Sequence, residues 1–178
     1  KYEPFWLFKG AYVTYTCITR AFSKPCDIES ICFEITNVTN TIFQVRCMTY
    51  RNNRVLTETL GFSNVSDGAC FFISPIDPQR TLWLWFSQLN HTGTNTRILR
   101  LDINHVSIES IRSPIGLRVC MVYEVYLSLE MRKPSHRVVN NTFRVYIDKE
   151  LYIVTKVASR EITIELTSTN IRPVNSRS

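Results

Sequence analysis

Cysteines carry the widest chemistry in this sequence, because thiols form disulfides, bind metals and act as nucleophiles. The six cysteines are Cys17, Cys26, Cys32, Cys47, Cys70 and Cys120. None of them forms a C-x-x-C motif, and no histidine lies near them at zinc-finger spacing. An even number of cysteines without metal-ligand spacing indicates disulfides formed in an oxidising compartment. We therefore expect a secreted, disulfide-bonded protein without a metal site, although the sequence does not choose among the possible pairings.

The carboxylates and histidines do not stand in a recognisable catalytic pattern. The aspartates occur singly, at Asp27, Asp67, Asp77, Asp102 and Asp148. The histidines are equally isolated, at His91, His105 and His136. The sequence contains no G-x-S-x-G elbow, no H-E-x-x-H motif and no P-loop. Two carboxylates could still meet in the folded chain, but the pattern predicts a protein with no catalytic residues and no cofactor.

Four asparagines begin N-x-S/T sequons, namely Asn37, Asn64, Asn90 and Asn140. A chain rich in Asn and Thr contains one or two such sequons by chance. Here each one lies beside a predicted turn or strand end, where a glycan could face water. The sequons therefore predict an N-glycosylated protein, in agreement with the oxidising compartment that the cysteines indicate.

Charge and hydrophobicity narrow the classes of partner. The chain has 178 residues and a net charge of +6, from 21 Lys and Arg against 15 Asp and Glu. The basic residues are scattered along strand-like segments, so no nucleic-acid partner is expected, although acidic glycans or membrane headgroups could be attracted. No apolar run is long enough to span a membrane. Without a signal peptide, Lys1 is expected to follow a cleavage site, and an anchor beyond Ser178 is left open.

Hydrophobic alternation with a period of two dominates the chain and predicts about a dozen strands, without any helix. The predicted strands cover residues 11–19, 29–37, 41–50, 54–62, 69–74, 81–90, 96–103, 105–111, 117–132, 137–148, 151–158 and 161–168. Short turns between them predict one all-β domain, an antiparallel β-sandwich or barrel stapled by disulfides. Its parts are expected to be an N-terminal apolar segment (1–10), the β domain (11–170) and a polar tail (171–178).

The register of the second and third predicted strands constrains the cysteines. If Phe33 lies opposite Val45, the apolar faces of both strands meet the core. The same register places Cys32 and Cys47 on opposite faces, so these two cysteines are not expected to pair. Cys32 is expected to bond within the cluster of the first three cysteines, and Cys47 to reach a distant strand.

Two aromatic segments are candidates for binding. Residues 81–86 are apolar on both faces, which is typical of a central strand buried on both sides or of an aromatic patch for a ligand or subunit. Pro4, Phe5, Trp6, Leu7 and Phe8 form a short apolar N-terminus. These five residues either pack on their own domain or complete the sheet of a neighbouring copy by strand addition.

The C-terminal part resembles a known group of proteins. Residues 143–155 and 162–171 form an aromatic-x-Asp turn, an apolar return strand and a closing Leu-x-Ser-Thr-Asn-Ile. This pattern resembles the ending of many archaeal secreted surface proteins, and residues 9–15 and 33–39 are similar to their first two strands. Lys-Glu-Leu at 149–151 departs from the Thr-Gly expected after the aspartate. The resemblance implies a heavily glycosylated extracellular β-domain, of a kind that in some archaea forms filaments by strand donation.

These observations lead to three hypotheses of function. The first is a non-enzymatic subunit of an extracellular filament or surface layer, with Pro4–Phe8 as the donor strand and other copies of the chain as partners. The second is a secreted lipocalin-like barrel for a small apolar ligand, lined by Trp83, Trp85, Tyr123 and Phe72. The third is a receptor or adhesin ectodomain that reads a protein or a glycan.

Overall fold

One sheet holds all nine strands of the chain that the structure, a computed structural model, describes; the described residues are 3–19, 28–88 and 95–173. In chain order the elements are β1 (Tyr12–Thr19), β2 (Ser30–Val38), β3 (Ile42–Arg51), β4 (Arg54–Asn64), α1 (Pro78–Ser87), β5 (Thr96–Ser113), β6 (Gly116–Met131), β7 (Arg137–Asp148), β8 (Val154–Ala158) and β9 (Ile162–Thr169). The strand order is β4-β3-β2-β1-β9-β8-β7-β6-β5, and every pair is antiparallel. The predicted single-domain, antiparallel all-β class is confirmed, in the form of an open sheet with β4 and β5 as its edges.

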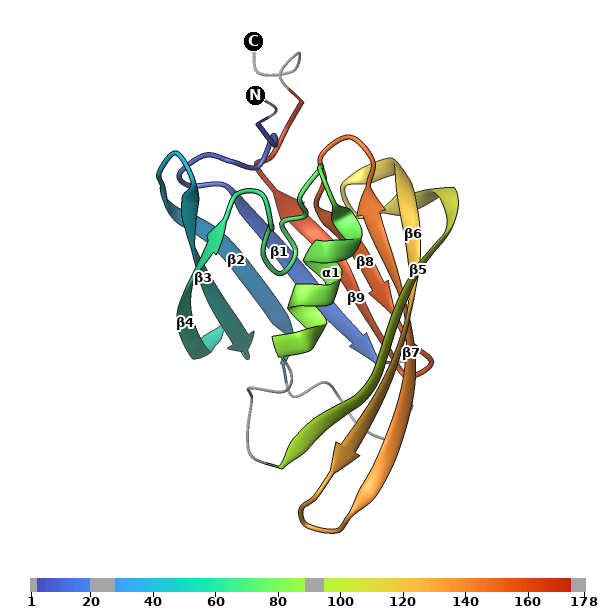
Figure 1. Cartoon of the computed structure of the whole chain (residues 1–178). Helices are drawn as coiled ribbons and strands as arrows, with labels where there is room; N and C mark the ends of the chain where they lie inside the picture. Colours follow the sequence, from blue (N-terminus) through green and yellow to red (C-terminus); the bar gives the residue numbers. More distant parts are fainter. Residues whose placement is uncertain (1–2, 20–27, 89–94, 174–178) are drawn as a thin grey trace.

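The sheet curves around α1 and the loop that precedes it, residues 65–77 (Figure 1). β1 and β9, from the two ends of the chain, pair at the centre of the sheet. β5, β6 and β7 continue past the other strands, and β6 and β7 are joined there by a projecting hairpin (Figure 1). The sheet therefore has a covered concave face and one long finger.

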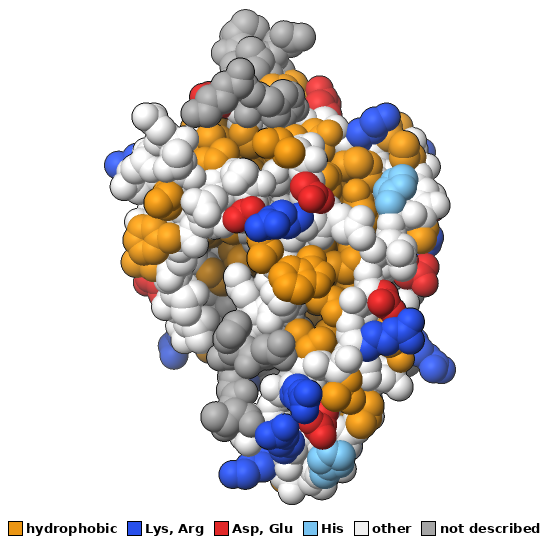
Figure 2. Space-filling view, viewed as in Figure 1, with side chains coloured by type: hydrophobic (Ala, Val, Ile, Leu, Met, Phe, Trp, Pro, Cys, Tyr) orange, Lys and Arg blue, Asp and Glu red, His pale blue; other side chains and the backbone are white. Residues whose placement is uncertain are grey.

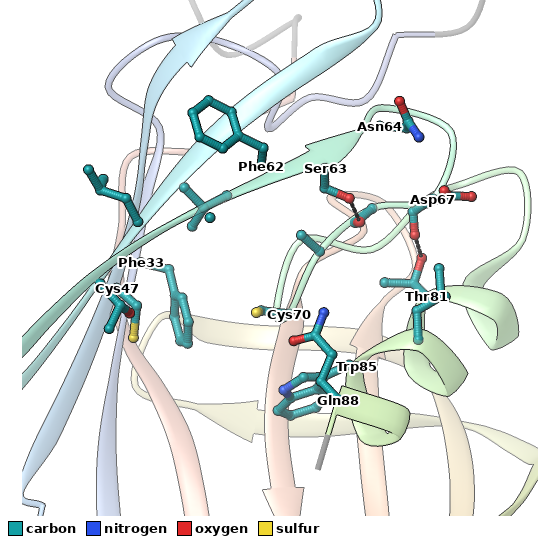
Figure 3. A pocket seen from close by; sticks show the side chains of 17 residues that line it. Phe33, Cys47, Phe62, Ser63, Asn64, Asp67, Cys70, Thr81, Trp85 and Gln88 are labelled. Carbon is teal, nitrogen blue, oxygen red and sulfur yellow. Dashed lines mark hydrogen bonds between the residues drawn. The ribbon is translucent and has the colours of Figure 1, made fainter. Parts of the chain in front are cut away.

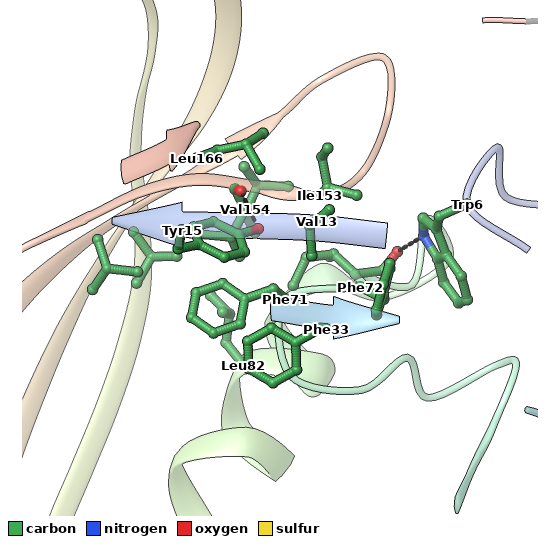
Figure 4. Close-up of a cluster of buried hydrophobic side chains, with 14 of the residues drawn as sticks. Trp6, Val13, Tyr15, Phe33, Phe71, Phe72, Leu82, Ile153, Val154 and Leu166 are labelled. Atoms are coloured by element: carbon green, nitrogen blue, oxygen red, sulfur yellow. Dashed lines mark hydrogen bonds between the residues drawn. The ribbon is translucent and has the colours of Figure 1, made fainter. Parts of the chain in front are cut away.

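The core lies between the concave face and α1, where apolar side chains alternate with polar ones along each strand. Tyr15 of β1 and Phe33 of β2 meet Phe71 of the loop, with ring centroids 4.2 and 4.8 Å away from that of Phe71 (Figure 4). The Tyr15 hydroxyl donates a 2.6 Å hydrogen bond to the carbonyl oxygen of Val154, so this buried polar group has a partner. Burial raises the pKa of Tyr15 well above its usual value. Leu82 of α1 closes the cluster from the opposite side.

The strand predicted at 81–90 is wrong, because residues 81–87 belong to α1; residues 89 and 90 lie outside the described residues. Asp77 is the N-cap, and its side chain accepts a hydrogen bond from the backbone N–H of Arg80 at 3.0 Å. Pro78 follows in the first turn, where its missing N–H leaves no helix hydrogen bond unmade. An apolar run of six residues is too short for its hydrophobic pattern to distinguish a helix from a strand. In the folded chain, one apolar side of α1 packs against the core and the other faces a cleft. No helix in the described part of the chain has the length and hydrophobicity needed to cross a membrane.

The prediction that Pro4–Phe8 donates a strand to a neighbour is also wrong. Trp6 is fully buried, and its indole N–H donates to the carbonyl oxygen of Ile73 at 3.0 Å. The indole packs against Phe43 and Phe72, with ring centroids 5.1 and 5.5 Å apart (Figure 4). Burying a large aromatic side chain in the core of its own domain stabilises the fold more than leaving that side chain exposed until a partner binds. The N-terminal segment thus packs into the core of its own domain.

The register of β2 and β3 differs by two residues from the expected one. Phe33 lies opposite Cys47, not Val45, and a bulge follows Ile35. A shift of two residues keeps every side chain on its face, so Cys32 and Cys47 do lie on opposite faces. No disulfide links Cys32, Cys47, Cys70 and Cys120, which are free thiols. Cys17 is disulfide-bonded, and Cys26 lies outside the described residues.

Candidate ligand-binding cleft

A cleft of about 500 Å³ lies between the β3–β4 end of the sheet and α1 (Figure 3). This volume falls in the usual range of small-molecule sites. One wall is β4 with the adjoining part of β3, and the facing wall is α1. Residues 67–70 of the loop close one end of the cleft. The cleft is therefore built by segments that are distant in the sequence.

The helical wall consists of Thr81, Leu84, Trp85 and Gln88. Their spacing of three, four and seven residues places them on one face of the helix and its C-cap. Leu82 and Phe86 point to the core instead, with 0% and 8% of their surface exposed. Helix α1 thus lies between the core and the cleft, with one apolar side facing each of them.

The loop that closes the cleft is pinned by three hydrogen bonds. The Ser63 hydroxyl donates to the carbonyl oxygen of Gly68 at 2.6 Å. The Thr81 hydroxyl donates to the carbonyl oxygen of Asp67 at 2.5 Å and accepts from the backbone N–H of Ser74 at 3.1 Å. Gly68 has a φ of +67°, and a Cβ there would lie 2.6 Å from the carbonyl oxygen of Phe72. Only glycine fits this position, so the end of the cleft is preformed.

Aromatic rings form the floor of the cleft. Phe33 of β2 and Trp85 of α1 both line the cleft, and both pack against Phe71. The ring centroid of Trp85 lies 4.6 Å from that of Phe71 and 5.0 Å from that of Phe86. Phe62 of β4 lies opposite Gln44, on the face of the sheet that points away from Val45 and the cleft, and is 73% exposed there. The rings on the floor are held by their neighbours, and the ring of Trp85 is the aromatic surface that the helical wall offers to a ligand.

Two free thiols, Cys47 and Cys70, line the same cleft (Figure 3). Burial, and then the neighbouring Cys47, raise the pKa of Cys70 to about 12. Burial also raises the pKa of Cys47, although a hydrogen bond with Thr59 opposes the shift. Both thiols are therefore protonated at neutral pH, and a protonated thiol is a poor nucleophile. They act as small apolar groups in the wall.

The described lining of the cleft offers no counter-ion for an anionic ligand. None of the described residues that line it is Lys, Arg or His. Its one carboxylate, Asp67, accepts a 2.8 Å hydrogen bond from Nε of Arg80 and is neutralised by that guanidinium. The other polar groups are hydroxyls and amides, among them Thr59 and Gln88. The arrangement fits a neutral ligand that has an apolar face and polar edges.

The predicted site residues do not gather in one place. Trp83 is 52% exposed on the outer side of α1, and only Trp85 of the proposed lipocalin set lines the cleft. Phe72 and Tyr123 are buried in the core. The Asp77-Pro78 pair is the sequence signal that could have indicated a helix, and with it one wall of the cleft.

The sequons occupy exposed positions where the structure describes them. Asn37 on β2, Asn64 on β4 and Asn140 on β7 are all exposed, and Asn90 lies outside the described residues. Asn64 stands at the rim of the cleft, with its side chain directed away from the thiols (Figure 3). Glycosylation at these asparagines stays a prediction. Among the described residues no cluster of three His, Cys, Asp or Glu side chains could hold a metal ion.

The overall fold is shared with known bacterial proteins, although no family model and no curated protein matches the chain. A crystal structure described as that of a lipoprotein from Parabacteroides distasonis superposes with a TM-score of 0.63 and 8% identity, over 96% of this chain and 100% of that one. An exported protein with a YmcC-like fold from Bacteroides fragilis gives a TM-score of 0.56 and 8% identity, over 92% and 96%. At such low identity the likeness shows the fold alone.

These comparisons overturn the expected resemblance and the functions drawn from it. The proteins that share the fold are bacterial and are described as lipoproteins or exported proteins, so the resemblance to archaeal filament proteins is wrong. The filament subunit assembled by strand complementation is contradicted as well, and its proposed donor strand is already buried in its own domain. The lipocalin-like barrel fails because the sheet is open and its proposed lining residues are dispersed.

Proposed function

We propose that this chain is an exported, non-catalytic binding protein whose cleft holds a segment of a neutral glycan. The observation that carries the proposal is the composition of the cleft. An aromatic and aliphatic floor is combined with hydroxyl and amide groups, and its described lining contains no cationic side chain. A preformed concave site with few polar groups is typical of ligand-binding proteins.

A neutral sugar matches both surfaces of the cleft. The C–H face of a sugar ring can pack on the aromatic ring of Trp85, and its hydroxyls can hydrogen-bond to Thr59 or Gln88. A fatty acid or a phosphate ester would lack a cation for its charged group. A purely apolar ligand would leave the hydroxyls and amides of the cleft without water or partners, which is unfavourable. A neutral, polyhydroxylated ligand is therefore the best fit.

The chemistry of the cleft also favours binding over catalysis. Hydrolysis of a glycosidic bond generally needs two carboxyl groups on either side of that bond. Asp67 is the one carboxylate among the described residues of the lining, and it is paired with Arg80. The two thiols are held in their protonated form by burial. We therefore assign the cleft a binding role.

Three features support export. The two crystal structures compared above are described as a lipoprotein and an exported protein. The sequence has four sequons and Cys17 is disulfide-bonded, as expected for an oxidising compartment. Asn37 and Asn140 are exposed on strands away from the cleft, where an N-linked glycan could be carried without blocking the site.

Tryptophan fluorescence during titration with short neutral gluco-, manno- and xylo-oligosaccharides tests the proposal. At least one series is expected to change the emission of Trp85 and to saturate. Trp85→Ala should weaken binding about tenfold or more through loss of the stacking surface, and Gln88→Ala should weaken it less. Trp83→Ala is the matched control, because Trp83 lies outside the cleft on the same helix. If no neutral oligosaccharide binds, or if the control loses as much affinity as Trp85→Ala, the proposal is wrong.

A further inference from the structure

The finger formed by β6 and β7 ends in a cluster of cations. We call Arg97, Arg132, Lys133, His136 and Arg137 the basic tip. Arg97 comes from β5, whose first residues pair with the end of β6. The other four lie in or beside the turn between β6 and β7. Figure 2 shows Lys and Arg side chains gathered at this end of the molecule, beside a histidine and one acidic side chain.

One carboxylate, Glu130, stands among these cations. It accepts a hydrogen bond from Nε2 of His136 at 2.8 Å and lies 3.6 Å from the guanidinium of Arg132. The hydrogen bond from His136, and then the charges of Arg132, His136 and Arg97, hold the pKa of Glu130 below its usual value. A single carboxylate cannot neutralise three arginines and a lysine. The basic tip therefore keeps an excess of positive charge.

The cations surround the end of the finger instead of lining one face. Arg97 is paired with Glu130, and Glu130 with Val138, so these side chains share one face. Arg137 is paired with Met131 on the opposite face. Arg132 and His136 are 53% and 66% exposed at the turn. Val138 adds an apolar group that is 53% exposed.

We propose that the basic tip docks end-on onto a membrane surface rich in anionic phospholipids. A convex end with cations on both faces and at its apex suits a plane of negative charge. An extended acidic polymer would instead follow a groove or a stripe on one face. Basic clusters are attracted to anionic leaflets within about a Debye length. Small apolar groups such as Val138 and Pro134 can enter the headgroup layer.

The other end of the same hairpin offers a comparison within the molecule. There Arg118 forms ion pairs with Asp148 and Glu150, so its charge is neutralised. Arg112 and Lys149 are exposed at that end and lie far along β5 and β7 from the basic tip. The pair Arg112→Gln and Lys149→Gln therefore removes the same charge as Arg132→Gln and Lys133→Gln, but from the opposite end.

Vesicle flotation tests the proposal with phosphatidylcholine vesicles, with or without about a third of phosphatidylglycerol. The full chain is expected to float only with the anionic vesicles and to be released as salt is raised from about 50 to 500 mM. Arg132→Gln/Lys133→Gln should weaken binding about thirtyfold, and the matched double variant at the opposite end should bind as the parent does.

Three outcomes would overturn the membrane proposal. The first is equal flotation with neutral vesicles, and the second is an equal loss in the two double variants. The third is absence of vesicle binding together with salt-sensitive binding to alginate, which would make an acidic polysaccharide the partner. Oligosaccharide binding in the cleft is measured separately, so either proposal can fail while the other stands.

Discussion

The cleft and the basic tip lie on the same sheet but are built in opposite ways. The cleft is concave, its described lining contains no cation, and its loop is fixed by hydrogen bonds from Ser63 and Thr81. The basic tip is convex and carries at least four cations on exposed side chains. Packing fixes the shape of the cleft, so recognition there depends on fit. At the tip recognition depends on charge, which does not require a fixed geometry.

The two regions also differ in how many segments of the chain must meet to form them. The cleft needs β2, β3, β4, the loop 65–77 and α1 to meet. The basic tip needs one hairpin and the first residues of the neighbouring strand. A substitution that disturbs packing should therefore damage the cleft region, whereas a substitution of similar size at the tip should leave the fold intact.

Trp6→Ala is expected to have the largest effect on stability, with a loss of about 3–5 kcal/mol in the free energy of unfolding. Trp6 is fully buried between Phe43 of β3 and Phe72 of the loop, next to the elements that build the cleft. The variant would leave a cavity and an unsatisfied carbonyl oxygen at Ile73. Urea denaturation followed by circular dichroism would measure the loss.

Val138→Ala at the basic tip is the matched control for this prediction. Val138 is 53% exposed, and its truncation should change the free energy of unfolding by only about 0.5 kcal/mol. Equal losses in the two variants would contradict the view that packing matters in one region and not in the other. A loss of less than about 1 kcal/mol for Trp6→Ala would mean that the N-terminal segment is only loosely held.

Alternation predicted much of the sheet, because period two is a local property of each strand. The strands at 29–37, 41–50 and 137–148 lie within a residue or two of their predicted bounds. The register was missed by two residues, since the bulge after Ile35 leaves no sign in the hydrophobic pattern. The segment 69–74 is no strand and takes part only in isolated bridges, one between Ala69 and Phe72 and one between Phe72 and Ile153.

The two candidate sites were not predicted, for different physical reasons. The cleft depends on α1, and a short apolar run does not distinguish a helix from a buried strand. Four residues of the basic tip lie close together in the sequence, between positions 132 and 137, so this part of the cluster was open to prediction and was overlooked among the other basic residues. The pairing of β5 with β6 adds Arg97, which the sequence alone does not place there.

The ion pairs at the two ends of β6 and β7 differ in their burial, and this difference provides a second test of the comparison. Asp148 is 1% exposed, accepts hydrogen bonds from Nε and Nη2 of Arg118, and caps the backbone N–H groups of Glu150 and Leu151. Asp148→Asn is expected to destabilise the fold by about 2–3 kcal/mol, because Arg118 loses its buried carboxylate partner and keeps only the exposed Glu150. Urea denaturation under the conditions used for Trp6→Ala gives the measurement.

Glu130→Gln is the control at the basic tip. The Glu130 ion pairs involve exposed partners, so the stability should change far less than in Asp148→Asn. The same variant removes the carboxylate that opposes the cations, and it should therefore strengthen flotation with anionic vesicles. A stability loss equal to that of Asp148→Asn, or unchanged flotation, would show that the two ends of the hairpin do not differ as described.

The smallest expected effect is on the rate of thiol alkylation. This rate directly compares how far water reaches into the cleft and to the basic tip. Because burial raises the pKa of Cys70 to about 12, its thiolate fraction at a given pH is small. Its alkylation rate should rise about tenfold per unit between pH 8 and 10 without levelling off, since the titration midpoint lies higher. Peptide mapping by mass spectrometry resolves this rate from that of a cysteine introduced at the basic tip by Ser135→Cys. The introduced thiol is exposed and stands among cations that favour the thiolate, so its rate should level off at or below the ordinary thiol pKa of about 8.5. If Cys70 levels off at the same pH, water reaches the thiol freely, and the cleft is not the dry, preformed site that the comparison requires.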